Sequence, residues 1–156
     1  MLILKNSRCL VGSAIRSAII SVAFLATVWP EVTAADTSQP VQTGALSIEL
    51  SSAQTDGASC LLSFVTQNTY AQDVAQAVFE TVLFDASGQV SQLTLLDFQD
   101  LPAGRTRVRQ FQFPMACTDI SRVLINGAET CHGTDLPENA CTHDLTLTSK
   151  VMELAG

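Results

Sequence analysis

Cysteine is the residue type in this chain that most clearly indicates a chemistry. Four cysteines, Cys60, Cys117, Cys131 and Cys141, follow the N-terminal segment, and a fifth, Cys9, lies within it. Thiols can form disulfides in an oxidising compartment or bind soft metal ions as thiolates. An even cysteine count behind an export signal is typical of a disulfide framework, so we expect two disulfides in the folded domain.

Two histidines beside two of these cysteines raise the alternative of a metal site. The set comprises Cys131, His132, Cys141 and His143, which is chemically competent for zinc or copper(I). Its spacing argues against this use, because adjacent Cys and His side chains cannot easily reach one ion from a strand. We therefore expect a disulfide with exposed histidines, no cofactor, and a metal site only as the alternative.

The N-terminus has the order of regions that is typical of a bacterial export signal. Lys5, Arg8 and Arg16 precede an uncharged stretch at 17–29, and small residues follow up to Ala35. The stretch is shorter than the roughly 20 residues that span a bilayer, so we expect cleavage rather than a permanent membrane anchor. An uncleaved anchor extending back past Arg16 is the alternative. We assign 1–35 to a signal peptide, 36–44 to a flexible leader and 45–156 to one domain, in the bacterial periplasm or secreted.

The charge of the mature chain limits its partners. After residue 35 there are fourteen acidic side chains and five cationic ones, which gives a net charge near −9. A surface of this sign repels nucleic acid and anionic lipid, so we expect neither as a partner. The cationic residues are Arg105, Arg107, Arg109, Arg122 and Lys150.

Short apolar runs with alternating side chains indicate an all-β domain. Leu46, Ile48 and Leu50 alternate with polar residues, as expected for a half-buried strand. Residues 85–88 (DASG) form a turn that predicts a hairpin. We expect a seven-stranded immunoglobulin-like β-sandwich with two disulfides. The predicted strands are 45–50, 60–66, 76–84, 89–95, 105–113, 120–126 and 145–151.

Three turn motifs give a resemblance to known envelope modules. They are VTQN at 65–68, LFDASG at 83–88, and LPAG at 101–104 followed by RQFQF at 109–113. This part of the chain resembles immunoglobulin-like bacterial modules of the FxLYD and CARDB kind, although those generally lack cysteines. The resemblance implies a seven-stranded sandwich used in adhesion, in assembly or as an accessory of a larger envelope protein. The chain also resembles a family of exported alphaproteobacterial proteins with this cysteine arrangement, which implies no activity.

Spacing favours one of the three possible disulfide connectivities. Cys131 and Cys141 enclose a polar loop that is long enough to return to its start and too short to reach far. That leaves Cys60 for Cys117, at the second and sixth predicted strands, the pair that immunoglobulin domains bridge. The other two connectivities stay open at this point.

Alternating arginines predict a basic ladder on an otherwise acidic protein. Arg105, Arg107 and Arg109 share the parity of Phe111 and Phe113 in one predicted strand. Either the environment of that face changes from solvent to core along the strand, or a bulge near Arg109 switches the parity.

The arginines have two interpretations. One is cross-strand pairing with Glu80, Asp97 or Asp100, which contributes little at a surface. The other is a partner-docking stripe, because arginine is enriched at interface hot spots.

No motif predicts a catalytic reaction. The sequence has no Gly-x-Ser-x-Gly elbow, no His-Glu-x-x-His and no phosphate-binding Gly-rich loop. His143 and Asp144 are adjacent, which would point them apart on a strand. We expect a non-catalytic binding or accessory module that docks onto another envelope protein or membrane complex, through Arg105, Arg107 and Arg109. The alternative is a periplasmic carrier of zinc, copper or a small ligand.

Overall fold

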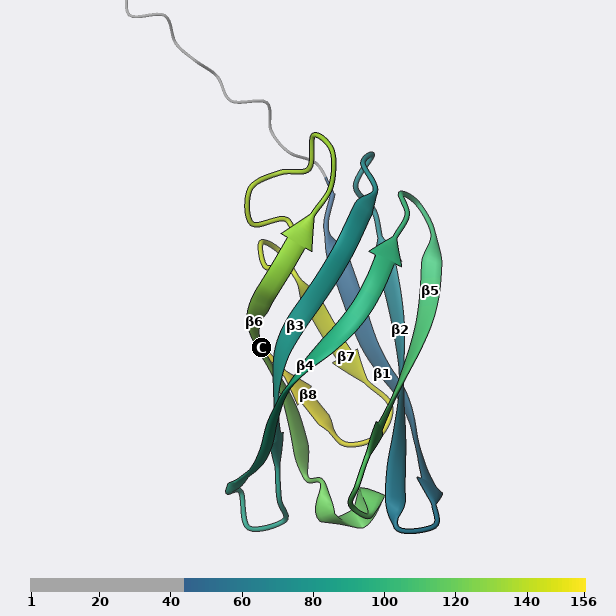
Figure 1. Cartoon of the computed structure of the whole chain (residues 1–156), viewed down its shortest axis with the longest axis vertical. Coiled ribbons are helices and arrows are strands. Elements are labelled where there is room, and N and C mark those ends of the chain that lie inside the picture. The colour runs from purple at the N-terminus through teal and green to yellow at the C-terminus, as the bar shows by residue number, and fades with distance from the viewer. Residues whose placement is uncertain (1–43) are drawn as a thin grey trace, which may run out of the picture. The chain divides into compact units, whose positions relative to one another are not determined.

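The computed structural model describes residues 44–156, which form two packed β-sheets and no α-helix (Figure 1). A short 3-10 turn, η1 (Cys117–Asp119), precedes the sixth strand. The predicted all-β sandwich is confirmed. The strands are β1 (Leu46–Asp56), β2 (Ser59–Asn68), β3 (Val74–Phe84), β4 (Val90–Leu101), β5 (Thr106–Phe113), β6 (Arg122–His132), β7 (Thr146–Ser149) and β8 (Glu153–Ala155).

Each sheet has four strands, and the two strand orders fix which edges are open. One sheet has the order β5-β2-β1-β7 and the other has the order β4-β3-β6-β8. The edge strands β4 and β5 contact each other across the two sheets, as do β7 and β8. β7 pairs in parallel with β1, and β8 pairs in parallel with β6, whereas the other pairings are antiparallel. The last two strands of the chain, β7 and β8, therefore each form one edge of a sheet.

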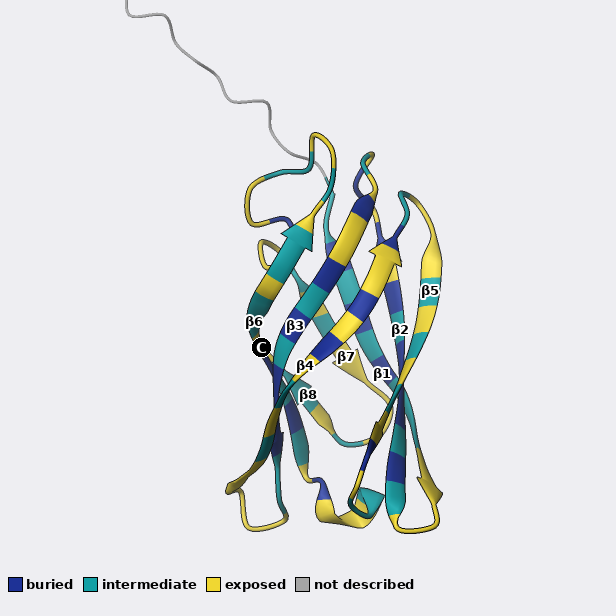
Figure 2. Ribbon diagram, in the orientation of Figure 1, coloured by how far each residue is buried: buried dark blue, intermediate teal, exposed yellow. Residues whose placement is uncertain are grey.

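Alternation along the strands supplies the core. Leu46, Ile48 and Leu50 of β1 are buried, as are Leu62 and Phe64 of β2. Each set lies on one face of its strand because successive side chains of a strand point to opposite faces. Figure 2 shows buried residues alternating with more exposed ones along the strands. The predicted inner faces of the first two strands are thus confirmed.

Phenylalanine rings join the two sheets at the centre of the core. Phe98 of β4 lies edge-on to Phe64 of β2, with ring centroids 5.6 Å apart, and edge-on to Phe79 of β3 at 5.4 Å. Phe111 of β5 packs on Phe64 and Phe98 at 5.9 and 5.2 Å. Such edge-to-face pairs add about 0.5–1.5 kcal/mol each beyond the area that they bury.

The sequence-based boundaries differ from the structure at several strands. β1 and β4 continue to Asp56 and Leu101, six residues past the predicted ends at 50 and 95. An eighth strand, β8, was not predicted, because three residues are too few to show alternation. The predicted end of the sixth strand at residue 126, before Gly127, is wrong, because β6 continues to His132. Register shifts opposite Phe79 and Glu80 accommodate the glycine within the ladder.

The export segments lie largely outside the part of the chain that is described. The predicted signal peptide at 1–35 falls there, as does the leader except for Gly44. Their assignment stays a prediction. Within 44–156, the structure has no helix of the length and apolar character that a membrane span requires.

Candidate functional site

Both expected disulfides are present, with the connectivity that spacing favoured. Cys60 of β2 is bonded to Cys117 of η1, with Cα atoms 4.8 Å apart, and Cys131 of β6 is bonded to Cys141, with Cα atoms 5.9 Å apart. The second bridge holds a loop whose Ala140 is buried and accepts a hydrogen bond from the hydroxyl of Tyr70 at 3.2 Å. These four cysteines therefore serve to fix the fold.

The histidines do not complete a metal site with these cysteines. The sulfurs of Cys131 and Cys141 are joined to each other, so neither is a thiolate ligand while the bridge is intact. His143 lies 3.3 Å from the carboxylate of Asp144, with both side chains more than half exposed, and His132 is also exposed. No group of three or more histidine, cysteine or carboxylate side chains within 44–156 is arranged to hold a metal ion.

The predicted parity problem in the arginine strand is resolved without a bulge. β5 pairs with β2 in continuous register, so Arg107, Arg109, Phe111 and Phe113 share one face. Phe113 is buried and Phe111 half-buried, whereas the half-buried Arg107 and Arg109 lie nearer the start of the strand. The environment of this face therefore changes from polar to apolar along the strand, as the first alternative predicted.

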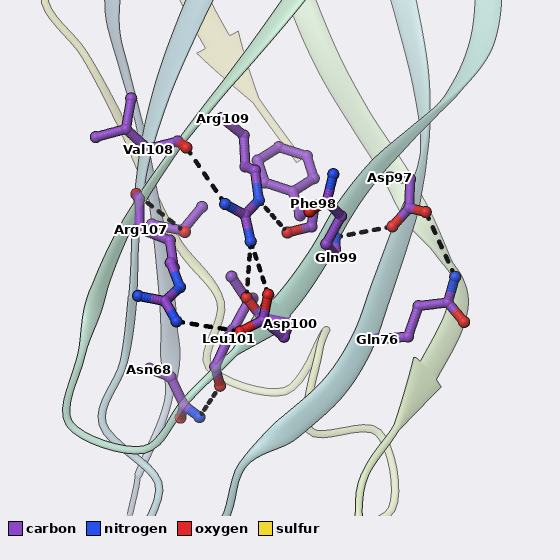
Figure 3. A network of polar contacts seen from close by, with 11 residues as sticks. Asn68, Gln76, Asp97, Phe98, Gln99, Asp100, Leu101, Arg107, Val108 and Arg109 are labelled. Atoms are coloured by element: carbon purple, nitrogen blue, oxygen red, sulfur yellow. Dashed lines mark hydrogen bonds and ion pairs between the residues drawn. The ribbon is translucent and has the colours of Figure 1, made fainter.

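Arg109 ties β5 to β4 through its guanidinium (Figure 3). Its Nε donates to the carbonyl oxygen of Phe98 at 2.6 Å, and its Nη2 donates to the carbonyl oxygen of Asp100 at 3.0 Å. Nη2 also lies 3.1 Å from the Asp100 carboxylate, and the side chain of Arg109 is only 18% exposed. Asp100 is 52% exposed, so the part-buried hydrogen bond to Phe98 should contribute more than the ion pair. We call Arg107, Arg109 and Asp100 the arginine brace.

Arg107 completes the brace from the same strand. Its Nη2 lies 3.1 Å from the second carboxylate oxygen of Asp100. The hydrogen bond from Arg107, supported by the charges of both arginines, holds the pKa of Asp100 below its ordinary value, although partial desolvation opposes the shift. These two arginines therefore pair with a carboxylate of another strand, as the first interpretation proposed. Of the three candidate carboxylates, Asp100 is the partner.

Arg105 does not belong to the brace. It precedes β5 and is exposed, and it has no ion pair with any residue of 44–156. The three arginines predicted as one docking stripe are thus divided by the structure. Two join the sheets, and one is directed to solvent.

Exposed apolar side chains on β4 form a surface that the sequence analysis did not identify. Val90, Leu93 and Leu95 are 62, 58 and 53% exposed. Register places Val90 beside Phe84 of β3 and Leu93 beside Val82. We call Val90, Leu93 and Leu95 the β4 apolar row. Its leucine alternation was visible in the sequence, but alternation alone does not indicate which face is buried.

A cavity lies at the other side of the sandwich, where β6, β7 and β8 meet. Its volume is about 500 Å³. Most of its lining is aliphatic, with polar groups from Asn126 and Thr142. The full lining is Ile125, Asn126, Gly127, Thr142, Leu145, Leu147, Leu154, Ala155 and Gly156.

Comparisons with known proteins give one structural likeness. No protein-family model matches the chain, and no curated protein matches it. A solved structure of IrmA from Escherichia coli is similar, with 14% identity, coverage of 67% of this chain and 91% of that chain, and a TM-score of 0.47. A likeness of this degree does not show a shared function. These comparisons relate the chain to no enzyme family, and the resemblance to FxLYD and CARDB modules stays a prediction.

Proposed function

We propose that this protein is an exported, non-catalytic binding or accessory module that docks onto another protein or membrane complex of the bacterial envelope. Two disulfides support an oxidising compartment, because such bonds are rare in reducing ones. The periplasm or the exterior of the cell, reached after cleavage near Ala35, is the location that we propose. The acidic charge argues against nucleic acid as the partner.

The β4 apolar row is the observation that carries the proposal. Val90, Leu93 and Leu95 are exposed on one strand, beside the half-buried Phe84. Contiguous apolar side chains at a surface are typical of protein interaction sites, whereas scattered ones are ordinary. Their polar surroundings include Glu80, which is opposite Leu95. An apolar centre with a polar rim is the usual composition of a protein interface.

The arginine brace gives the docking surface its rigidity. Arg109 holds the C-terminal half of β4 against β5 through backbone acceptors at Phe98 and Asp100, so the end of the strand that follows the row is fixed before a partner binds. A preorganised surface loses less conformational entropy on binding. We therefore assign Arg107 and Arg109 a positioning role. Arg105, exposed near the C-terminal end of β4 and apart from the row, is retained as a separate contact for an acidic partner.

Affinity capture from the native host, in mild detergent, tests this function. We expect the tagged wild-type protein to recover an envelope partner, and Leu93→Lys/Leu95→Lys to lose it. The matched control is Val108→Lys on β5, because Val108 is also 58% exposed but lies on the other sheet. A wild-type protein recovered without a partner, or equal recovery by the leucine variant, would contradict the proposal.

A small-ligand carrier is the second candidate, and the cavity at β6, β7 and β8 favours it. Its volume of about 500 Å³ lies within the range of sites for small molecules, and its lining suits an apolar ligand with one polar group. Native mass spectrometry of gently purified protein should then show a bound mass that is lost on denaturation. Bound zinc or copper together with free thiols at Cys131 and Cys141 would instead favour the metal carrier.

A further inference from the structure

The edge of β4 is divided into a protected half and an open half. Near its C-terminal end, Arg109 occupies the carbonyl oxygens of Phe98 and Asp100. A register irregularity and the positive φ of Gln99 interrupt the same end, which also carries the carboxylate of Asp97. Bulges, charges and covering side chains are the means by which proteins block edge strands from pairing.

The other half of β4 has fewer of these protections, which are the irregularity at Ser91 and a contact of Ser91 Oγ with Met115 Sδ at 4.0 Å, both at its start. Residues 92–96 read QLTLL, without charge, proline or glycine. Within 44–156, β4 pairs only with β3. Alternate backbone N–H and C=O groups of an edge strand point away from its neighbour, so this half presents unpaired groups to another strand. Leu93 and Leu95 flank that edge and are exposed.

We propose that this half of β4 pairs antiparallel with β4 of a second copy of the chain, about a twofold axis at Thr94. In this register Leu93 lies opposite Leu95 of the second copy, and Leu95 lies opposite Leu93. Asp97 lies opposite the uncharged Ser91. The segment is therefore complementary to itself, as an isologous interface requires.

The pairing of the leucines selects this register over its neighbour. An axis at Leu95 would place the apolar Leu93 opposite the carboxylate of Asp97, whereas the axis at Thr94 places Leu93 opposite Leu95 and leaves Asp97 opposite the polar Ser91. Opposed like charges and mismatched pairs destabilise strand pairing, and apolar cross-strand pairs stabilise it. The net charge near −9 of each copy still opposes association, so added salt should strengthen the dimer by screening.

This pairing extends the proposed function, on which it rests for its biological role. The two four-stranded sheets would join into one, and the leucines of both copies would lie together on its outer face. The docking surface for the envelope partner would then be twofold symmetric.

Sedimentation of the purified protein, produced from its full sequence, tests the dimer. We expect a concentration-dependent dimer that tightens as salt is raised. Leu93→Lys/Leu95→Lys should raise its dissociation constant by about a hundredfold, through lost apolar burial and added repulsion. Val108→Lys adds one equivalent charge on the edge strand of the other sheet and should leave the constant unchanged. Thermal unfolding would confirm that both variants fold.

A cysteine at the axis gives a second, geometric test. Directly opposed antiparallel residues have Cα atoms about 4.5–5.5 Å apart, which suits a disulfide. Thr94→Cys should therefore form a covalent dimer under mild oxidation much faster than Val108→Cys. A wild-type protein that stays monomeric, or equal cross-linking by both variants, overturns the dimer. A monomer that still captures its partner overturns the dimer alone, and a dimer that captures none overturns the docking function alone.

Discussion

Arg109 of β5 donates a hydrogen bond from Nε to the backbone carbonyl oxygen of Phe98 of β4, over 2.6 Å. Phe98 is fully buried and contacts three other phenylalanine rings. A charged side chain at the edge thus fixes the backbone of a residue whose ring lies in the centre of the core. Because β5 and β4 belong to different sheets, this hydrogen bond joins the two sheets.

We expect Arg109→Ala to destabilise the protein by about 2 kcal/mol, because it removes charge-assisted hydrogen bonds to the part-buried carbonyl group of Phe98 and the exposed one of Asp100. Arg105→Ala is the matched control and should change the free energy of unfolding by less than about 0.5 kcal/mol. Urea denaturation measures both. Equal effects of the two substitutions would show that the brace has no stabilising role.

Stability should fall in acid through two aspartates. Hydrogen bonds from Arg107 to Asp100, and from the hydroxyl of Ser87 and the backbone to Asp85, lower the pKa of each carboxyl. A lowered pKa contributes stability that is present above the ordinary value of about 4 and is lost as pH falls through the folded value. We expect the urea midpoint to drop below about pH 4, and Asp85→Asn/Asp100→Asn to reduce that drop. An unchanged acid slope in the variant would contradict this assignment.

Asn68 should be among the most sensitive polar positions. Its side chain is fully buried, donates to the carbonyl oxygens of Leu101 and Gln72 at 2.8 and 2.9 Å, and accepts from the backbone N–H of Tyr70 at 2.8 Å. Asn68→Ala would leave these groups unpaired, at a cost of about 3 kcal/mol. Asn68→Asp should destabilise more at neutral pH, because a carboxylate would face two carbonyl oxygens. Denaturant midpoints of the two variants test this order.

Thiol counting under denaturing, non-reducing conditions should find no free thiol among Cys60, Cys117, Cys131 and Cys141.

The two bridges should contribute unequally to stability. The first bridge closes a loop of 57 residues, and its removal should lower the free energy of unfolding by about 4 kcal/mol. The second closes a loop of 10 residues, and its removal should lower it by about 3 kcal/mol. Paired alanine substitutions at each bridge measure the difference. A larger loss from the second bridge would mean that loop length does not govern their contributions.

Export predicts a mature chain that begins near Ala35 or Asp36. Intact-mass measurement of protein from the native host would locate this end. A mature form that retains 17–29 would show an uncleaved anchor instead.

The inner face of β1 could be predicted because apolar and polar residues alternate strictly over 46–50, and that of β2 because Leu62 and Phe64 are two positions apart. The orientation of β4 could not, because within 92–96 the purely apolar face, Leu93 and Leu95, is the outer one, and the irregularity at Ser91 changes the parity. Leu96 is buried, whereas Leu95 beside it is exposed. Only the pairing with β3 decides between them.

The carboxylate that pairs with Arg107 and Arg109 also could not be predicted, because it is decided by the tertiary structure. Three carboxylates, Glu80, Asp97 and Asp100, were candidates from sequence. Asp97 instead accepts from Gln76, and Glu80 accepts from Asn126. Asp100 is selected because β4 and β5 meet across the two sheets, a proximity that no local pattern encodes.

The late position of β7 and β8 along the chain bears on how this protein reaches its native state. β1 pairs with β7 about a hundred residues later, and Lys150 of the following turn binds Glu49 over 2.8 Å. Contacts between such distant segments slow folding, because a long loop must close before they form. One edge of each sheet therefore stays uncovered until residues 146–155 are in place. A chain that crosses a membrane unfolded would complete both sheets only after this segment had arrived on the far side.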